Sequence, residues 1–342
     1  MVKGITMRRP SLLDVARRAG VSPALASYVL NGRRGRNAPA APRTMELVRK
    51  AAAELGYSPN QNARNLRRQR TEQILVLVGR LDAPWSDLVV SRLQQEADDH
   101  RYSVLAVLVD SNQRLQHVLE LLRRGVADAV VVTPMPHTYN ADELRDLEAR
   151  GTRVLAFSDS LAAGDFDVVR AHEYEASRSA VDTLIARGRR RIAFIGHPHD
   201  AEAGSCSPRY QAYLDALTSA GFFDNDLVVG GAEDRVAAYR STERLVADGE
   251  RPDAIFSASD RGAISALLAL EHAGVRVPEE VAVVGFGSAP EGELARPPLT
   301  TIGRDGGGME GVAHQLFARL GSGEVGPLEI ELPVEVIWRQ ST

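Results

Sequence analysis

The sequence predicts a small all-α head, a short basic connecting segment and a larger α/β body made of two doubly wound lobes. Apolar residues recur at helical spacing in the first 60 residues, whereas from Thr71 onward short apolar runs alternate with helical stretches. Charge divides at the same place: residues 1–70 hold 15 Lys and Arg against 3 Asp and Glu, and the remainder holds 26 against 42. A cationic head on an anionic body indicates a polyanion as the partner of the head alone.

Composition narrows the class of protein further. A chain of 342 residues that is 44% hydrophobic and 25% charged is typical of a soluble protein with two or three domains. No run approaches the roughly 18 apolar residues of a membrane helix, and Met1–Pro10 lacks the apolar core of a signal peptide, so we expect a cytoplasmic protein without a membrane partner. The single cysteine, Cys206, excludes a disulfide framework within the chain.

The first two predicted helices form a helix-turn-helix. Residues 12–20 space apolar side chains along one helical face and end in Gly20, a residue suited to closing a helix. That face consists of Leu12, Leu13, Val15, Ala16 and Ala19. The second helix, Pro23–Asn31, follows at once, because Ser22 can cap it and Pro23 needs no amide hydrogen bond in the first turn. Its buried face consists of Leu25, Ala26, Val29 and Leu30.

The opposite face of the second helix carries small and polar side chains, as a recognition helix does in a DNA major groove. The residues expected to contact DNA there are Ser22, Pro23, Ala24, Ser27, Tyr28 and Asn31. A third helix over Arg43–Leu55, stopped by Gly56, is expected to cover the core with Leu47, Val48, Ala51, Ala52 and Leu55. A three-helix protein-interaction module would show the same periodicity, so the pattern alone leaves that alternative open.

Two stretches of this head resemble a known family. The run from Leu13 to Gly32, and Leu55-Gly-Tyr-Ser-Pro-Asn60 followed by Ala63-Arg-Asn-Leu66, resemble the headpiece of the LacI/GalR family of transcription regulators. The resemblance implies a helix-turn-helix DNA-binding domain over residues 11–59. It also implies a repressor that acts as a homodimer, and a two-fold protein requires a near-palindromic operator.

The head departs from the family at two places. Tyr28 is the sixth residue of the recognition helix, where the family often has Arg or His. Its hydroxyl cannot make the bidentate guanine contact of Arg, so the preferred operator should differ. The loop over residues 33–41 is about four residues longer than usual and adds Arg33, Arg34 and Arg36. We expect phosphate contacts from these arginines, a solvated loop being the alternative.

A hinge helix and linker are predicted over residues 60–70. The helical part, Asn60–Arg68, is shorter than the roughly 12 to 15 residues that an isolated helix needs, so its folding must depend on partners. The family resemblance implies that two hinge helices pack in the minor groove, with Asn60, Ala63 and Leu66 toward DNA and Leu66 wedged between base pairs. An ordinary basic linker would explain the neighbouring arginines but not an apolar leucine among them.

The body, residues 71–342, has the pattern of buried parallel strands joined by helices. The apolar runs are Ile74–Val78, Val104–Val109, Ala129–Val132, Val154–Phe157, Ile192–Ile195, Ala254–Phe256 and Val281–Phe286. The blocks 189–196, 297–302 and 332–339 resemble the family's effector and dimerisation domain, whose fold is like that of periplasmic sugar-binding proteins. The resemblance implies three crossovers, which we place near residues 170, 302 and 333. Lobe 1 then comprises about 71–169 and 303–332, and lobe 2 about 170–302 and 333–342.

Ligands of such sheets bind beyond the carboxyl ends of the strands. Trp85 follows the first strand, Asp159 the fourth, and Asp260 follows Phe256, while Arg209 lies after Ile195. Placed against the family, these four fall at effector-pocket positions, and an arginine and carboxylates beside an aromatic ring suit a sugar or another polyol. Each of them could instead be a surface charge or a core residue.

Other pocket positions differ from common family members. Gly287 replaces a frequent Asp, Arg304 stands where a neutral polar residue is common, and Gly306, Gly307 and Gly308 replace bulkier residues. We include Arg304 among the expected effector contacts, and a second arginine facing the ligand would favour an acidic or phosphorylated sugar.

Motifs for a cofactor, a metal ion or catalysis are weak or absent in the sequence. Gly306–Gly311 fits the G-x-G-x-x-G pattern, but it comes at the end of the chain, so we expect no dinucleotide cofactor. His197-Pro-His199-Asp200 resembles a metal cluster, yet the sequence spacing provides no further His or Cys ligand, and a loop at the pocket rim is the preferred interpretation. Neither a nucleophile elbow nor a Walker loop is present, so we expect no enzyme.

The expected mechanism couples the two parts of the chain. Effector binding changes the angle between the lobes and thereby forms or melts the paired hinge helices. The chain ends at Thr342 without a heptad tail, so a dimer rather than a tetramer is expected. The alternatives are an enzyme with an incidental basic head, which turnover would reveal, and a sugar-binding transport protein, which would need an export signal.

Overall fold

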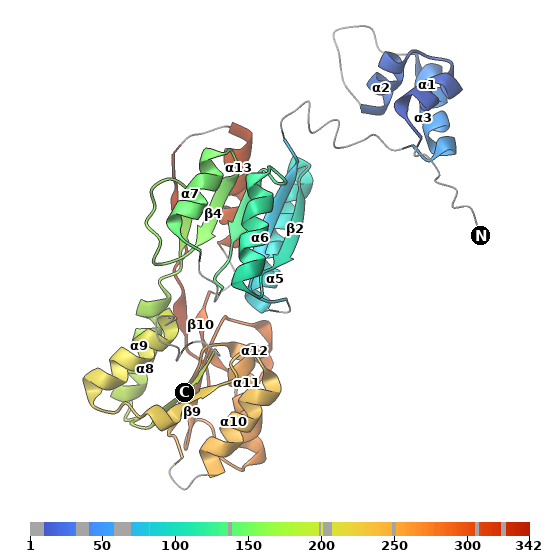
Figure 1. Ribbon diagram of the computed structural model, residues 1–342. Helices are drawn as coiled ribbons and strands as arrows, with labels where there is room; N and C mark the ends of the chain where they lie inside the picture. Colours follow the sequence, from blue (N-terminus) through green and yellow to red (C-terminus); the bar gives the residue numbers. More distant parts are fainter. Residues whose placement is uncertain are drawn as a thin grey trace, which may run out of the picture. The chain divides into compact units, whose positions relative to one another are not determined.

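The computed structural model describes residues 10–31, 41–57, 70–81, 83–135, 139–197, 200, 207–247, 251–304, 308–322 and 326–342. The chain divides into two compact units, residues 1–71 and residues 72–342 (Figure 1). Within the described ranges, no helix combines the length and the apolar character needed to cross a membrane.

In the described part of the first unit, three helices pack around a small core. They are α1 (Leu12–Ala19), α2 (Pro23–Asn31) and α3 (Pro42–Leu55). Ser11 and Asp14 form a capping box at the start of α1, and Gly20, with φ of 67°, closes its end. Ser22 accepts the amide of Leu25 at 3.2 Å and so caps α2. The buried core consists of Val15, Ala16, Ala26, Val29, Val48, Ala51 and Ala52.

Two leucines expected in this core lie at the surface instead. Leu13 is 44% exposed and Leu47 is 48% exposed. Leu13 follows Leu12 and Leu47 precedes Val48, and both of those neighbours contact the core. Because successive side chains on a helix point about 100° apart, Leu13 and Leu47 point away from the core. The buried stripe of α3 consists of Val48, Ala51 and Ala52, which lie three and four residues apart on one face of the helix.

Lobe 1 of the body is built on a six-stranded parallel sheet in the order β11-β5-β4-β3-β1-β2. The strands are β1 (Gln73–Val78), β2 (Ser103–Leu108), β3 (Ala129–Val132), β4 (Arg153–Phe157), β5 (Asp167–Arg170) and β11 (Glu329–Glu331). Its helices are α5 (Pro84–His100), α6 (Asn112–Arg123), α7 (Ala141–Ala149) and α13 (Met309–Ser322). Alternate residues of β1 pack on α5 and α13, and the intervening ones pack on α6 and α7, so both faces are covered.

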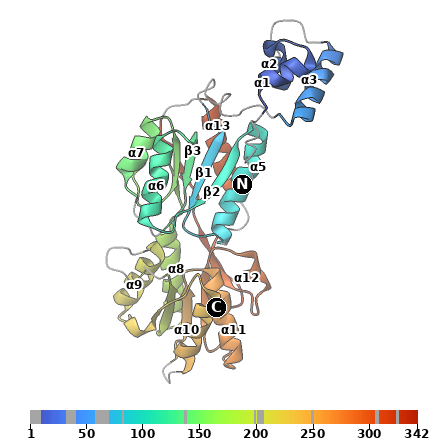
Figure 2. The same ribbon diagram turned by 45° about the vertical axis from the view of Figure 1, so that its right-hand side comes forward.

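Lobe 2 is built on a second six-stranded sheet in the order β12-β10-β9-β8-β6-β7, in which only β12 is antiparallel to its neighbour. Figure 2 shows this lobe with helices packed around its sheet. The strands are β6 (Ile192–Gly196), β7 (Val228–Gly230), β8 (Ala254–Ser257), β9 (Ala282–Phe286), β10 (Thr300–Gly303) and β12 (Glu335–Ile337). Its helices are α8 (Glu173–Ala186), α9 (Pro208–Ala220), the short 3-10 helix η1 (Asn225–Leu227), α10 (Arg235–Ala247), α11 (Asp260–His272) and α12 (Pro290–Leu294). This alternation confirms the predicted doubly wound fold.

The chain passes between the two sheets three times. It leaves lobe 1 after β5, returns after β10, and leaves again after β11. The first and third passages lie side by side, since Leu332 donates its amide to the carbonyl of Arg170 at 2.7 Å and Val334 donates to that of Ala171 at 2.9 Å. These backbone bonds join two of the three segments that connect the lobes.

Candidate functional site

Helix α2 presents its start to solvent. Ser22, Pro23 and Ala24 are exposed, whereas Ala26 and Val29 are buried in the core of the first unit. Tyr28 is half-buried and packs against that core. Ser27 is also half-buried. The predicted recognition face is therefore a shallow surface of small side chains around Tyr28.

Several predicted DNA-contacting residues lie outside the described residues. They are Asn60, Ala63 and Leu66 of the predicted hinge helix, Arg33, Arg34 and Arg36 of the preceding loop, and the side chain of Asn31. Their roles stay predictions.

Trp85 begins α5 and faces the end of β4. Its ring meets that of Phe157 edge to face, with centroids 5.6 Å apart and planes at 86°. Trp85 is half-buried, so part of the indole stays accessible at the carboxyl ends of β1 and β4. The expected role of Trp85 as an aromatic platform for the ligand stays a prediction.

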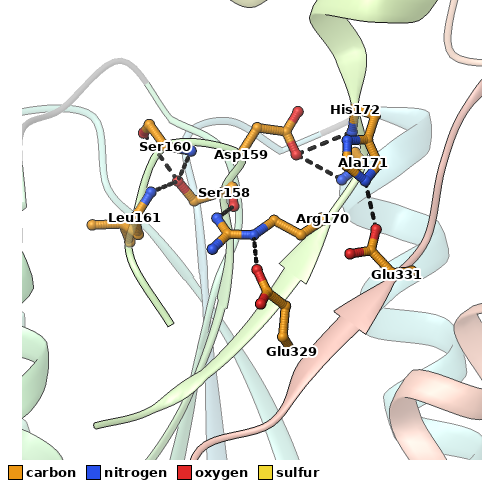
Figure 3. Close-up of polar contacts among 9 residues, drawn as sticks. All are labelled: Ser158, Asp159, Ser160, Leu161, Arg170, Ala171, His172, Glu329 and Glu331. Atoms are coloured by element: carbon orange, nitrogen blue, oxygen red, sulfur yellow. Dashed lines mark hydrogen bonds and ion pairs between the residues drawn. The ribbon is translucent and has the colours of Figure 1, made fainter. Parts of the chain in front are cut away.

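Asp159, in the loop after β4, caps the first helix of lobe 2. Its Oδ1 accepts the backbone amides of Ala171 at 2.7 Å and His172 at 3.0 Å, and its Oδ2 accepts that of Glu173 at 2.9 Å. Figure 3 shows the carboxylate directed at the start of α8. A negative charge is favourable there because the unpaired N–H groups of a helix start carry partial positive charge. Asp159 therefore links the lobes through the first crossover.

Two ion pairs join the first and third crossovers beside this cap (Figure 3). Arg170 donates to Glu329 at 2.5 Å and to the carbonyl of Ser158 at 2.6 Å. His172 pairs with Glu331, and the hydrogen bond that its Nε2 donates to that carboxylate raises the pKa of His172 above its usual 6.5. Sequence analysis missed these four residues. The Glu-x-Glu spacing of β11 was the available signal, but its pairing with β5 spans about 160 positions of sequence.

Arg209 lies in the first turn of α9 and is largely buried. Its Nε and Nη2 donate to the two oxygens of Glu173, each at 3.0 Å, and its Nη1 donates to the carbonyl of Ala258 at 2.6 Å. The guanidinium also lies over the ring of Phe286, 3.6 Å from the centroid. Arg209 thus stands at the carboxyl ends of β8 and β9, where the sequence placed it, with Glu173 as a partner that the sequence did not reveal.

Asp260 is 2% exposed, and both of its oxygens are used within the protein. Oδ2 accepts the amide of Ala289 at 2.6 Å and Oδ1 accepts the hydroxyl of Thr301 at 2.6 Å. Burial raises the pKa of this carboxyl above its usual value. A Cβ on Gly285 would lie 2.2 Å from Oδ1, which shows how closely the backbone surrounds it. Asp260 thus holds the loop after β9 in place, and its expected contact with the effector stays a prediction.

Arg304 makes a hydrogen bond to a backbone carbonyl of a crossover, and Gly287 has a backbone conformation that favours glycine. Arg304 donates to the carbonyl of Pro333 at 2.5 Å and so ties the second crossover to the third. Gly287 has φ of 127°, a conformation that side chains rarely adopt, and its amide donates to Ile302 at 2.7 Å. Glycine at position 287 therefore allows the positive φ that the loop after β9 adopts.

The His197–Asp200 loop does not assemble a metal site from the described residues. Asp200 accepts the amide of His197 at 2.6 Å, and the imidazole lies 3.7 Å from Glu233. Among the residues that the structure describes, no three His, Cys, Asp or Glu side chains are placed to hold a metal ion. His199 and Cys206 lie outside these residues, as do Gly306 and Gly307.

The free edge of lobe 1 carries an apolar surface. The edge strand β2 leaves Leu105 46% exposed, and Leu81, 58% exposed, lies in the loop after β1. A groove of about 400 Å³ between this edge and α5 is lined by Val78, Arg80, Leu81, Ser86, Asp87, Val90, Ser91, Gln94, Gln95, Asp98 and Ala106. Exposed apolar side chains along an unpaired strand edge favour association with another protein surface.

Comparison with known proteins matches both units of the chain. Residues 11–60 match the model of bacterial regulatory proteins of the lacI family, and residues 181–342 match a periplasmic binding protein-like domain. The HTH-type transcriptional regulator GntR of Pseudomonas aeruginosa is 31% identical over 98% of this chain and 97% of its own length. CelR of Thermobifida fusca, another HTH-type transcriptional regulator, is 31% identical over 98% of both chains.

Solved structures agree in fold. A complex of the transcriptional regulator CelR with cellobiose shares 27% identity with a TM-score of 0.64, and covers 98% of this chain and 100% of that one. A lac repressor dimer bound to its operator and the anti-inducer ONPF shares 23% identity with a TM-score of 0.74, over 98% and 99% of the two chains.

Proposed function

The chain belongs to the LacI family of bacterial regulatory proteins, and we propose that it is a repressor that binds a near-palindromic operator under the control of a small molecule bound between its lobes. The observation that carries this proposal is the presence, on one chain, of a helix-turn-helix head and a two-lobed body that align with transcription regulators along nearly their whole length. None of these relatives is named as an enzyme.

The head is proposed to read DNA through the exposed start of α2. Ser22, Pro23 and Ala24 are small enough to allow close approach of the helix to base edges, and Tyr28 offers a ring edge and a hydroxyl. The net positive charge of residues 1–70 supplies the attraction to phosphates that positions the head. Asn60, Ala63 and Leu66 are proposed to complete the interface in the minor groove.

The effector is proposed to be a sugar or sugar derivative at the carboxyl ends of the strands of both lobes. Trp85 and Arg209 supply an aromatic face and hydrogen-bond donors at those ends. The CelR structure with cellobiose supports a carbohydrate, because that regulator shares 27% identity over nearly the whole chain. Asp159 and Arg304 are proposed to respond to the ligand through the crossovers that they hold.

The protein is proposed to act as a homodimer. The apolar edge of β2 and the groove beside it form a surface on which a second copy could pair along the same edge in two-fold fashion. A dimer presents two recognition helices, and two-fold symmetry explains a near-palindromic operator. Bound effector would then change the angle between the lobes at the three crossovers and so alter the separation of the two heads.

Selection from a pool of random DNA duplexes tests this proposal. The full chain should enrich one near-palindromic sequence, and Tyr28→Ala should change the preferred bases near the centre of each half-site. Enrichment of no sequence, with binding that depends only on salt concentration, would refute a sequence-specific regulator.

A further inference from the structure

The guanidinium of Arg209 is already occupied by a carboxylate of its own chain. Glu173 accepts two parallel hydrogen bonds from it, at 3.0 Å each, in the bidentate geometry that arginine forms with carboxylate ligands. The side chains of Arg209 and Glu173 are only 19% and 15% exposed, so water screens the pair weakly. Together with the bond to Ala258, three of the five N–H groups of Arg209 are used.

The backbone from which the Glu173 side chain extends is held at the first crossover. Glu173 is the first residue of α8, and its amide donates to Oδ2 of Asp159 at 2.9 Å. Arg209 is fixed as well, since its guanidinium lies over the ring of Phe286. The carboxylate and the guanidinium are therefore held toward each other by two independent parts of the fold.

We propose that Glu173 is a specificity-determining residue, whose carboxylate occupies Arg209 and keeps negatively charged ligand groups away from it. The inference rests on the proposed function, which places the effector at Arg209. A ligand carboxylate or phosphate would have to displace Glu173 and would add a second negative charge beside it in weakly screened surroundings. A neutral hydroxyl meets no such cost, because it can donate to Glu173 and accept from a remaining N–H of Arg209.

The effector class that follows is a neutral polyhydroxy compound. The other arginine expected at the site, Arg304, donates to the carbonyl of Pro333, which is a crossover contact. Within the buried pair, the negative charge of Glu173 balances the positive charge of Arg209. The proposal therefore replaces the expectation of an acidic or phosphorylated sugar.

Acetate is a suitable probe, because it carries the same group as Glu173. In the full chain, Glu173→Ala leaves Arg209 without its carboxylate, so acetate should bind there and raise the midpoint of thermal unfolding saturably, by about 2–4 °C at ten times its dissociation constant. Chloride at equal ionic strength serves as the reference. The wild type and the control Glu175→Ala, which removes an exposed charge two residues along α8, should show no such rise.

A second variant keeps the test decisive if Glu173→Ala folds poorly. Glu173→Gln preserves the size of the side chain and removes only its charge, and acetate should stabilise it too. Adding Arg209→Met to either variant should abolish the acetate effect. Absence of an acetate effect in both single variants, or an equal effect in the wild type, would overturn the role of Glu173. Operator binding by the same wild-type preparation judges the proposed function separately.

Discussion

Asp159 of lobe 1 accepts the backbone amide of Glu173, the first residue of lobe 2's first helix, at 2.9 Å. The same carboxylate accepts two further amides from Ala171 and His172. The cap of α8 comes from lobe 1, whereas the helix belongs to lobe 2. These hydrogen bonds at the first crossover therefore depend on how the two lobes are placed relative to each other. Both the stability of the body and its response to a ligand should therefore depend on Asp159.

Replacing Asp159 by Ala should destabilise the body. The substitution removes a cap and a favourable charge at the start of α8, which costs about 1 kcal/mol and lowers the unfolding midpoint by about 2–4 °C. Calorimetry of the full chain measures the change, with Asp165→Ala, in an exposed ion pair of the same lobe, as the control. A midpoint equal to that of the control would show that the cap is dispensable.

The pair of His172 and Glu331 should make stability depend on pH. The pKa of His172 in the folded chain is raised, chiefly by the hydrogen bond that its ring donates to Glu331 and also by the negative charges of Glu331, Asp159 and Glu175. Its contribution is then complete below the unfolded value of 6.5 and is lost as pH rises through the raised pKa. Glu331→Gln should lower the pKa of His172 measured by NMR and should destabilise the chain more at about pH 5.5 than at about pH 9. A cost independent of pH would contradict this assignment.

Asp260 should matter for the folding of lobe 2, because its carboxylate is a buried acceptor for two groups of the fold. Asp260→Ala leaves the amide of Ala289 and the hydroxyl of Thr301 without their buried acceptor, which should cost about 1–3 kcal/mol. Urea unfolding followed by Trp338 fluorescence in a Trp85→Phe background measures lobe 2, since Trp338 follows β12. Asp182→Ala, which removes an exposed carboxylate on α8, should change stability by less than about 0.5 kcal/mol. Equal effects of the two variants would remove the case for a positioning role.

The edge of lobe 1 should hold two copies together. Leu105→Lys places a charge on the exposed apolar edge of β2 and should shift the chain from dimer to monomer in sedimentation at micromolar concentration. Leu47→Lys, at a leucine of similar exposure in the head, should leave the dimer intact. A dimer that survives Leu105→Lys must use another surface.

The elements that the sequence predicted best were those with strong local patterns. The three head helices were predicted from the spacing of apolar residues, with Gly20 marking the end of α1 and Ser22 the start of α2. The strands β1, β3 and β9 were predicted from unbroken apolar stretches. The short strands β5, β7 and β11 were not recognised as strands, because each has no more than two apolar residues besides glycine and acquires its structure from distant partners.

Single residues of the site were harder to assign than strands. Sequence position placed Arg209 and Asp260 at strand ends, but it could not show that Glu173 pairs with the first or that Thr301 and Ala289 enclose the second. The pairs Arg170–Glu329 and His172–Glu331 join segments far apart in sequence, and only the fold brings them together. Such pairings depend on the register of β5 with β11, which no local pattern specifies.

The central claim is that the body switches the head, and thermodynamic linkage tests it most directly. A neutral sugar that raises the unfolding midpoint of the full chain would be chosen from a panel, and the affinity of the chain for its selected duplex would be measured with and without that sugar. The account predicts a change of about 5- to 150-fold in DNA affinity, and an equal change in sugar affinity when DNA is bound. An affinity for DNA that stays the same at saturating sugar would contradict it.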